Sequence, residues 1–369
     1  MSSRLSQGSL GSVLVIGGCG FLGHHIVTQL TSPGFLGTSV SVLDLDTKRN
    51  RQPSVSYYEA DITSATDVRR VYLEAKPQVV IHTASPIFAS RSSNAYHAVN
   101  VEGTRILLET AGQTGHTVAF IYTSSPSVVH DGASDLVMAD ERLPVLRGSS
   151  QPEIYNRTKG IAENYVLAAN RRCNGIVTCA IRPSNMFGAG DTQLLTALLK
   201  TCKQGTTRFQ LGDNSNLFDF TCVSNAAHAH ILAAQQLLNT TPDTPADKKI
   251  DGEAFLITND QPYYFWDFVH AVWGAAGYNM KPEDIWVTPV GLGLLIAEIL
   301  EWMFWLFSFG SREPNLTKKK IRYSALTRTF CIDKAKSRLG YKPIMEIGEG
   351  IRTGVKWYLE SQVDAKKWQ

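Results

Sequence analysis

A cluster of glycines directly after an apolar segment constrains the fold of this chain more than any other feature. The stretch "VLVIGGCGFLGHHIV", residues 13–27, lies between a strand-like run and a helix-like run. Gly17 and Gly20 would let the backbone approach a pyrophosphate, Gly23 would let the helix pack closely on the strand, and the helix start would supply free N–H groups. The stretch is either a dinucleotide-binding turn or an ordinary tight turn between packed elements. As a dinucleotide-binding turn, it would hold the cofactor with Gly17, Gly20, Phe21, Leu22 and Gly23.

A second strand-like segment, "VSVLDLD", ends at Asp44, about 20 residues beyond the glycine cluster. A carboxylate at this position accepts hydrogen bonds from the ribose hydroxyls of adenosine and repels a 2′-phosphate. Asp44 therefore favours NAD over NADP. Lys48, Arg49 and Arg51 follow closely enough to leave NADP open.

Apolar, β-rich runs alternate with helix-like segments through the first half of the chain. Such alternation is typical of an α/β fold with a doubly wound, Rossmann-type parallel sheet and helices on both of its faces. The pattern loosens after about residue 190. We expect a cofactor-binding core with the catalytic residues at 12–190 and a smaller, mainly substrate-binding lobe at 191–369, with an apolar membrane-associating helix at 290–310.

A second group of residues could catalyse proton transfer. "YTSSPSVV" (122–129) ends a strand-like run, and "YNRTK" (155–159) follows it on a helix-like run. Tyr155 and Lys159 are four residues apart and so share one helix face, where an ammonium group can stabilise a phenolate. Tyr155 could then accept a proton from a substrate hydroxyl, while Ser125 holds the same oxygen. A surface helix pair is the plain alternative, and the glycine turn upstream weighs against it.

Composition excludes several classes of function. The net charge is only +3, from 36 basic and 33 acidic residues, which argues against nucleic-acid binding. The six cysteines lack metal-ligand spacing, so we expect reduced thiols and no metal site. They are Cys19, Cys173, Cys179, Cys202, Cys222 and Cys331. The polar N-terminus "MSSRLSQGSLGS" carries no apolar core of a secretory signal.

The chain carries a series of motifs, which are in order GGCGFLG, DLD, EADI, HTAS, YTSS, YNRTK and IRPSNMFG. This series resembles the extended short-chain dehydrogenase/reductases, and within them the 3β-hydroxysteroid dehydrogenase family. The resemblance covers roughly residues 12–360 and is greatest to members that act on 4α-carboxysterols. It implies NAD(P)-dependent oxidation of the sterol 3β-hydroxyl with loss of the C4 carboxyl as CO₂, in ergosterol-type biosynthesis. The alternatives are a 3β-hydroxysteroid or triterpenoid dehydrogenase of a specialised pathway, and a redox-inactive NAD-binding scaffold.

The resemblance also assigns further cofactor contacts. Asp61 with Ile62 would hold the adenine. "TAS" would line the cofactor channel, and "RPS" would flank the nicotinamide; their residues are Thr83, Ala84, Ser85, Pro183 and Ser184. The family's serine falls on Ser124 or Ser125, and strand alternation with motif spacing favours Ser125.

Two features bear on the substrate. Many relatives carry a tyrosine in a "VYG"-like ending after the serine strand, whereas this chain has "SVVHDG". That departure argues against a sugar-nucleotide epimerase and for an apolar substrate. The aromatic and aliphatic runs "QPYYFWDFVHAVW" and "FLITND" are equally compatible with a substrate pocket and with a packed core.

The segment "VGLGLLIAEILEWMFWLFSFG" (290–310) approaches a membrane span in length and apolarity. Glu298 and Glu301 in its middle disfavour a full span. A helix lying in the membrane interface, with Trp302 and Trp305 at headgroup level, avoids that cost. A buried helix beside the substrate cleft is the remaining alternative.

Two basic segments extend the membrane hypothesis. The run "TKKKIR" (317–322) would face anionic headgroups, and the ending "KKWQ" resembles a dilysine retrieval signal. Both favour the cytosolic face of the endoplasmic reticulum membrane. The expected partners are a sterol substrate and a membrane surface, with no nucleic acid. A homodimer and a complex with other sterol C4-demethylation enzymes stay open.

Overall fold

Seven parallel strands form the main sheet of the computed structural model, which describes residues 9–86, 93–308, 314 and 316–367. The strand order is β12-β7-β5-β4-β1-β2-β3. The strands span β1 (Ser12–Ile16), β2 (Ser39–Asp44), β3 (Ser56–Glu59), β4 (Val79–His82), β5 (Ala119–Thr123), β7 (Val177–Pro183) and β12 (Glu253–Ile257). The chain runs outward from β1 in one direction and then returns to β4 on its other side, so a topological switch point lies at β1 and β4. The predicted doubly wound fold is confirmed.

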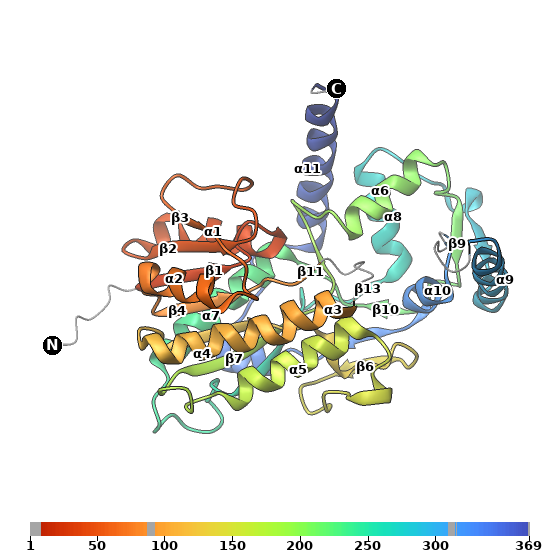
Figure 1. The fold of residues 1–369 in the computed structure, drawn as a ribbon. Coiled ribbons are helices and arrows are strands. Elements are labelled where there is room, and N and C mark those ends of the chain that lie inside the picture. Colours follow the sequence, from red (N-terminus) through yellow and green to blue (C-terminus); the bar gives the residue numbers. More distant parts are fainter. Residues whose placement is uncertain (1–8, 87–92, 309–313, 315, 368–369) are drawn as a thin grey trace.

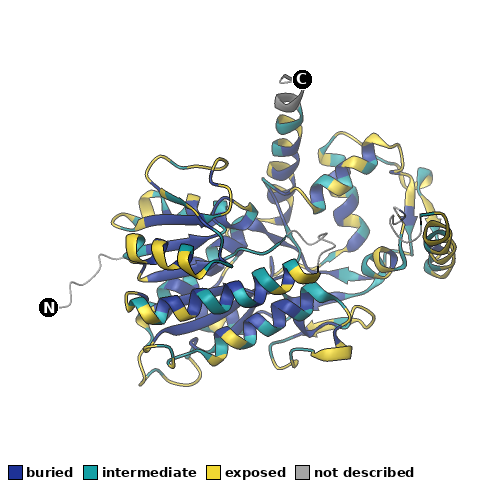
Figure 2. Ribbon diagram, viewed as in Figure 1, coloured by how far each residue is buried: buried dark blue, intermediate teal, exposed yellow. Residues whose placement is uncertain are grey.

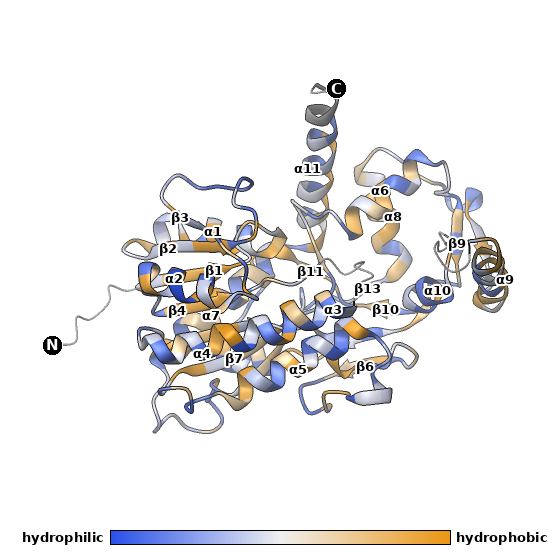
Figure 3. Cartoon of the chain, in the orientation of Figure 1, coloured by the Kyte–Doolittle hydropathy of each residue, from blue (hydrophilic) through white to orange (hydrophobic). Residues whose placement is uncertain are grey.

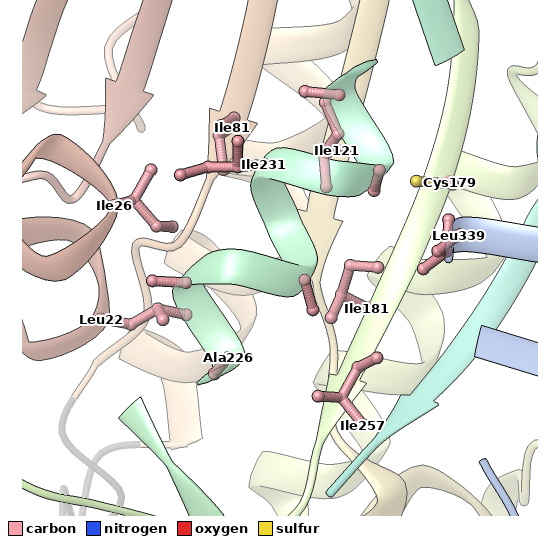
Figure 4. Close-up of a cluster of buried hydrophobic side chains, with 14 of the residues drawn as sticks. Leu22, Ile26, Ile81, Ile121, Cys179, Ile181, Ala226, Ile231, Ile257 and Leu339 are labelled. Atoms are coloured by element: carbon pink, nitrogen blue, oxygen red, sulfur yellow. The ribbon is translucent and has the colours of Figure 1, made fainter. Parts of the chain in front are cut away.

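Helices cover both faces of this sheet (Figure 1). One face carries α1 (Phe21–Leu30) and α7 (Val223–Asn239), and the other carries α2 (Ala65–Ala75), α4 (Thr104–Thr114) and α5 (Ile154–Ala168). α3 (Ser93–Tyr96) leads into α4 through a π-helical segment, His97–Gly103. Figure 4 shows Ile26 of α1 beside Ile231 of α7 and next to Ile81 of the sheet, and Leu22 and Ile121 belong to the same buried cluster. Strand residues alternate between the two faces, which explains why these buried runs read as continuously apolar.

The second lobe is built on short strands and four helices. A four-stranded sheet has the order β13 (Tyr263–Tyr264), β10 (Leu217–Phe218), β15 (Arg328–Phe330), β6 (Leu136–Ala139). Two pairs, β8 (Met186–Phe187) with β11 (Thr221–Cys222) and β9 (Phe209–Leu211) with β14 (Trp286–Thr288), accompany it. The helices are α6 (Leu194–Lys203), α8 (Phe265–Ala275), α10 (Lys318–Ala325) and α11 (Ile347–Lys367). The division near residue 190 stays a prediction; α7 and β12 from beyond it complete the main sheet.

The two apolar runs that could line a substrate pocket lie in different parts of the structure. "FLITND" begins within β12, where Phe255, Leu256 and Ile257 are fully buried in the main core. "QPYYFWDFVHAVW" forms β13 and α8, and its Phe268 is fully buried in a second aromatic core. The other side of α8 borders a cavity of about 210 Å³ between α6, β9 and α10, to which Trp266 contributes. The first run is therefore core, and the second is both core and cavity lining.

Helix α9 (Val290–Ser308) stands apart from both cores. It is the one helix in the described ranges that is long and apolar enough to cross a membrane, with a mean hydropathy of 1.8. Only Gly293 and Ala297 on it are buried, and Trp302 and Trp305 are each 63% exposed. Figure 2 shows this helix as mostly exposed, and Figure 3 shows it as strongly apolar. The alternative of a buried helix is wrong, because so little of α9 packs against the protein.

The acidic and basic residues near α9 pair with one another. Lys318 Nζ lies 3.0 Å from Glu298 Oε1 and 3.8 Å from Glu301 Oε2, and its backbone N–H donates to Glu301 Oε1. Lys319 Nζ bonds Glu153 Oε2, before α5. The expectation that the whole run 317–322 faces headgroups needs correction, since two of its lysines are engaged by the protein. Residues 309–310 lie outside the described residues, as do the last two residues of "KKWQ".

Candidate active site

The predicted site residues follow the carboxyl ends of parallel strands, so the fold brings them to one edge of the sheet. Gly17 follows β1, Asp44 ends β2, Thr83 follows β4 and Ser125 follows β5. Pro183 ends β7. This edge, at the switch point, is where open α/β sheets bind ligands.

Local geometry explains two of the three motif glycines. Gly17 has φ +80°, and a Cβ there would lie 2.8 Å from the backbone N of Ala84. A Cβ at Gly23 would lie 2.1 Å from Gly17 O, so only glycine allows α1 to approach the turn. Gly20, at the start of α1, is exposed, and among the described residues the atom near a Cβ there is Gly17 O at 3.2 Å. The helix start is open to a phosphate at Gly20.

A fourth glycine completes the packing of the turn. A Cβ at Gly18 would lie 2.6 Å from Val42 Cγ2 on the neighbouring strand. Phe21 and Leu22 begin α1, and Leu22 is buried in the core. Leu22 therefore contributes to this site through packing of the helix.

Asp44 joins the end of β2 to the glycine turn. Its Oδ2 accepts the backbone N–H of Cys19 at 2.9 Å, and its Oδ1 accepts that of Leu45 at 2.8 Å. Burial raises the pKa of Asp44, while these two N–H groups act in the opposite direction. Arg51 stacks on the ring of Tyr57 at 4.3 Å and donates to Thr47 O. Lys48 and Arg49 are exposed, and the choice between NAD and NADP stays as predicted.

The residues assigned to the adenine and to the cofactor channel are held in place by backbone contacts. Asp61 Oδ1 accepts the N–H of Thr63 at 2.8 Å, and Ile62 is buried. Thr83 Oγ1 donates to Ile16 O at 2.8 Å, which ties the end of β4 to β1. Ser184 Oγ donates to Asp219 O at 2.7 Å, so its hydroxyl is satisfied inside the protein.

Tyr155 and Lys159 occupy successive turns at the start of α5. Lys159 is 2% exposed; its Nζ donates to Thr123 O at 2.8 Å and lies 4.9 Å from the centre of the Tyr122 ring. Burial lowers the pKa of Lys159 to about 7, although Glu163 opposes this effect. Burial, with a smaller contribution from Tyr96, raises the pKa of Tyr155 to about 12. The protein by itself therefore does not lower the pKa of Tyr155 as expected, because desolvation of the phenol disfavours its charged form.

The two candidate serines differ in access. Ser124 is 3% exposed, and its Oγ finds no hydrogen-bond partner within the described chain. Ser125 is half-buried, and its Oγ accepts the N–H of Ser127 at 3.2 Å. Ser125 stays the predicted catalytic serine, and its greater access supports that choice.

The structure adds a polar network that the sequence reasoning missed. Asn100 lies in the π-helical segment; its Oδ1 accepts from Ser85 Oγ at 3.0 Å, and its Nδ2 donates to Thr158 Oγ1 at 3.0 Å. Thr158 Oγ1 in turn donates to Tyr155 O. The network ties the end of β4 to α5, which carries Tyr155 and Lys159. The available signal was an asparagine inside the apolar run "AVNVEG", where a buried amide needs partners.

Comparisons with known proteins agree with this arrangement. The model of the 3-beta hydroxysteroid dehydrogenase/isomerase family matches residues 14–287. The chain is 40% identical to the decarboxylating sterol-4-alpha-carboxylate 3-dehydrogenase of Schizosaccharomyces pombe, covering 94% of this chain and 97% of that protein. It is 38% identical to the enzyme of the same name from Saccharomyces cerevisiae, with the same coverage.

A solved structure has the same fold. The Bordetella bronchiseptica enzyme WbmH, in complex with NAD⁺, superposes with a TM-score of 0.69 at 15% identity, covering 95% of this chain and 99% of that one. The family match and the two relatives show that this chain belongs to the 3-beta hydroxysteroid dehydrogenase/isomerase family.

Proposed function

We propose that this protein oxidises the 3β-hydroxyl of a 4α-carboxysterol with NAD and releases the C4 carboxyl as CO₂, in sterol biosynthesis of the ergosterol type. The observation that carries the proposal is the placement of Ser125, Tyr155 and Lys159 at the switch-point edge of the sheet. The two yeast relatives, by their names, are decarboxylating 3-dehydrogenases of sterol 4α-carboxylates.

The residues present fit a dinucleotide. The cradle at Gly17 and Gly23 has no room for a Cβ, and Gly20 opens the helix start toward a pyrophosphate. Asp44 adds a carboxylate at the position that selects NAD. When bound, NAD accepts the hydride from C3 of the substrate.

The chain's own residues handle the proton and the oxygen. Tyr155 takes the proton of the 3β-hydroxyl, and Ser125 donates a hydrogen bond to the same oxygen. Lys159 is oriented by its bond to Thr123 O. Its ammonium group would stabilise the phenolate of Tyr155 against the effect of burial, which raises the pKa of that phenol.

Loss of CO₂ follows from the product of oxidation. The new C3 carbonyl is β to the carboxylate, so the bond from C4 to the carboxyl carbon can break with its electron pair moving onto the C3 oxygen. CO₂ leaves, and C4 then takes up a proton, which balances the proton that Tyr155 removed from the hydroxyl. Ser125 and Tyr155 already lie at that oxygen, so this step needs no additional acid.

The test is turnover by the purified protein. Incubation with a 4α-carboxysterol and NAD should produce NADH and a 3-ketosterol that lacks the C4 carboxyl. A dehydrogenase of a specialised triterpenoid pathway would instead prefer a substrate without that carboxyl. A redox-inactive scaffold would bind NAD and form no NADH, although it would have no need for all three catalytic residues.

We also propose that α9 lies along a membrane surface. Glu298 and Glu301 pair with Lys318 on the side of α10, which leaves an outer face of apolar side chains. That face includes Leu295 and Ile299, which are 57% and 51% exposed. Location on the cytosolic face of the endoplasmic reticulum, a homodimer and a complex with other C4-demethylation enzymes are further parts of this proposal.

Vesicle flotation tests the membrane contact. The wild-type protein should float with vesicles of neutral phosphatidylcholine, because the apolar face supplies most of the binding. The double substitution Leu295→Glu with Ile299→Glu should abolish flotation. Val137→Glu, at a position 69% exposed elsewhere on the protein, is the matched control and should leave flotation unchanged. Equal flotation of all three proteins would contradict the proposal.

A further inference from the structure

Arg328, on β15, is a buried cation for which the described residues supply no counter-ion. Its residue is 6% exposed, and its guanidinium carbon lies 5.4 Å from the ring centre of Phe218 and 5.2 Å from that of Tyr323. Nη2 donates to Ser127 Oγ at 3.2 Å, whereas Nε has no acceptor within the described residues. Burial lowers the pKa of Arg328, and the Tyr323 phenol acts in the opposite direction.

A second buried arginine shows what the fold normally provides. Arg182 is 3% exposed and forms two hydrogen bonds to the carboxylate of Glu163, through Nε at 2.9 Å and through Nη2. Removing a charge from water is costly unless an opposite charge and hydrogen bonds compensate for it. Arg182 receives that compensation, whereas no carboxylate among the described residues supplies it to Arg328. Burial of the Arg328 charge lowers the stability of the fold, and such a loss is typical of a residue kept for ligand binding rather than for stability.

Arg328 lies next to the serine proposed to hold the substrate oxygen. Its partner Ser127 donates its backbone N–H to Ser125 Oγ at 3.2 Å, so one residue bridges the guanidinium and that serine. Asn185 follows Ser184 and interacts with the Tyr323 phenol, on which Arg328 stacks. Arg328 and Asn185 therefore both contact Tyr323, beside the proposed site.

We propose that Arg328 binds the C4 carboxylate of the sterol substrate. This inference rests on the proposed function, because it needs a substrate whose anion is one carbon away from the reacting alcohol. A guanidinium with an unused N–H matches a planar carboxylate better than it matches any neutral group. In the substrate, the carboxylate is attached to C4, next to the reacting carbon C3. In the protein, Arg328 binds Ser127, which contacts Ser125, so the guanidinium and the serine proposed to hold the C3 oxygen are also close together. Arg328 is thus a specificity-determining residue for the acid.

The assignment has two chemical consequences. A sterol without the carboxyl leaves the buried guanidinium unpaired, so binding discriminates strongly against it. During decarboxylation the negative charge moves from the carboxylate to the C3 oxygen, held at Ser125. The cation therefore remains close to the negative charge before and after the C–C bond breaks.

The experiment compares two ligands with three proteins. The ligands are a 4α-carboxysterol and the same sterol without the carboxyl; the proteins are wild type, Arg328→Met and Arg322→Met, the last an exposed arginine on α10. Equilibrium binding is measured by tryptophan fluorescence, and KM and kcat are measured separately. Arg328→Met should weaken binding and raise KM for the acid by about 30-fold or more. Its effect on the neutral sterol should stay within about threefold.

Controls separate a binding role from a structural one. NAD affinity and the unfolding midpoint of Arg328→Met should equal or exceed those of wild type, because an uncompensated buried charge is removed. Arg328→Lys should recover part of the affinity for the acid. Arg322→Met should match wild type for both sterols.

The outcomes are distinguishable from failure of the proposed function. Wild-type protein that binds the acid selectively, and loses that selectivity with Arg328→Met, supports the inference even if no NADH forms, whereas absence of NADH refutes the proposed function. Equal losses for both sterols, no loss for the acid, or no binding of either sterol to wild type would overturn the role of Arg328.

Discussion

Replacing Lys159 with methionine should stabilise the fold while removing activity. The lysine is 2% exposed, and burial lowers its pKa from 10.5 to about 7. This pKa difference corresponds to about 5 kcal/mol of destabilisation of the fold. The cost applies at any pH where Lys159 is protonated in the unfolded chain, because burial in the folded chain disfavours its charged form. Loss of the hydrogen bond to Thr123 O offsets about 1 kcal/mol or more of the gain. We expect Lys159→Met to be more stable by about 2–4 kcal/mol at pH 7.

The pH dependence carries the sharper test. Between pH 7 and 10.5 the unfolded wild type binds more protons at this position than the folded wild type does, so wild-type stability rises with pH relative to the variant. The stability gap should be largest at and below pH 7 and should shrink as pH approaches 10.5. Urea unfolding of both proteins without cofactor, from pH 6 to 9.5, measures it. A variant less stable than wild type, or a gap independent of pH, would refute the burial of this ammonium.

Three further substitutions test the site. Tyr155→Phe should leave the Kd for NAD within about twofold of wild type while lowering kcat at least about 100-fold, since only the hydroxyl is lost; retained turnover would show that another group takes the proton. Asp44→Ala should weaken NAD binding about tenfold and improve the relative use of NADP in steady-state kinetics, and a wild-type preference for NADP would disprove the role of Asp44. Gly23→Ala should destabilise the protein by several kcal/mol in urea unfolding, because its Cβ would lie 2.1 Å from Gly17 O; an unchanged unfolding midpoint would contradict this geometry.

The sequence predicts best what depends on local geometry. The positive φ of Gly17 and the close approach at Gly23 are properties of a single turn, so spacing alone indicates them. The parallel sheet follows from the buried apolar runs, and the edge that carries the site follows from the parallel sheet. Family membership was also evident from the order of these motifs, and the family match confirms it.

Interactions between segments that are far apart in the chain could not be predicted from the sequence. In the sequence, Lys318 and Lys319 look like part of a run that binds lipid headgroups. In the structure, they pair with Glu301 and Glu153, and Lys319 and Glu153 are 166 residues apart. Arg328 meets Ser127 across 201 residues, and no periodic pattern relates them. The raised pKa of Tyr155 could not be read from a Tyr-x-x-x-Lys spacing, because burial of the phenol depends on the surrounding fold.

The most direct test of the central claim is the stoichiometry of CO₂ to NADH. A 4α-carboxysterol carrying an isotopic label in its carboxyl group is incubated with the purified protein and NAD, and labelled CO₂ and NADH are followed together. We predict one labelled CO₂ for each NADH, and neither product with Tyr155→Phe. NADH without labelled CO₂, from a product that retains its carboxyl, or labelled CO₂ without NADH, would contradict the account.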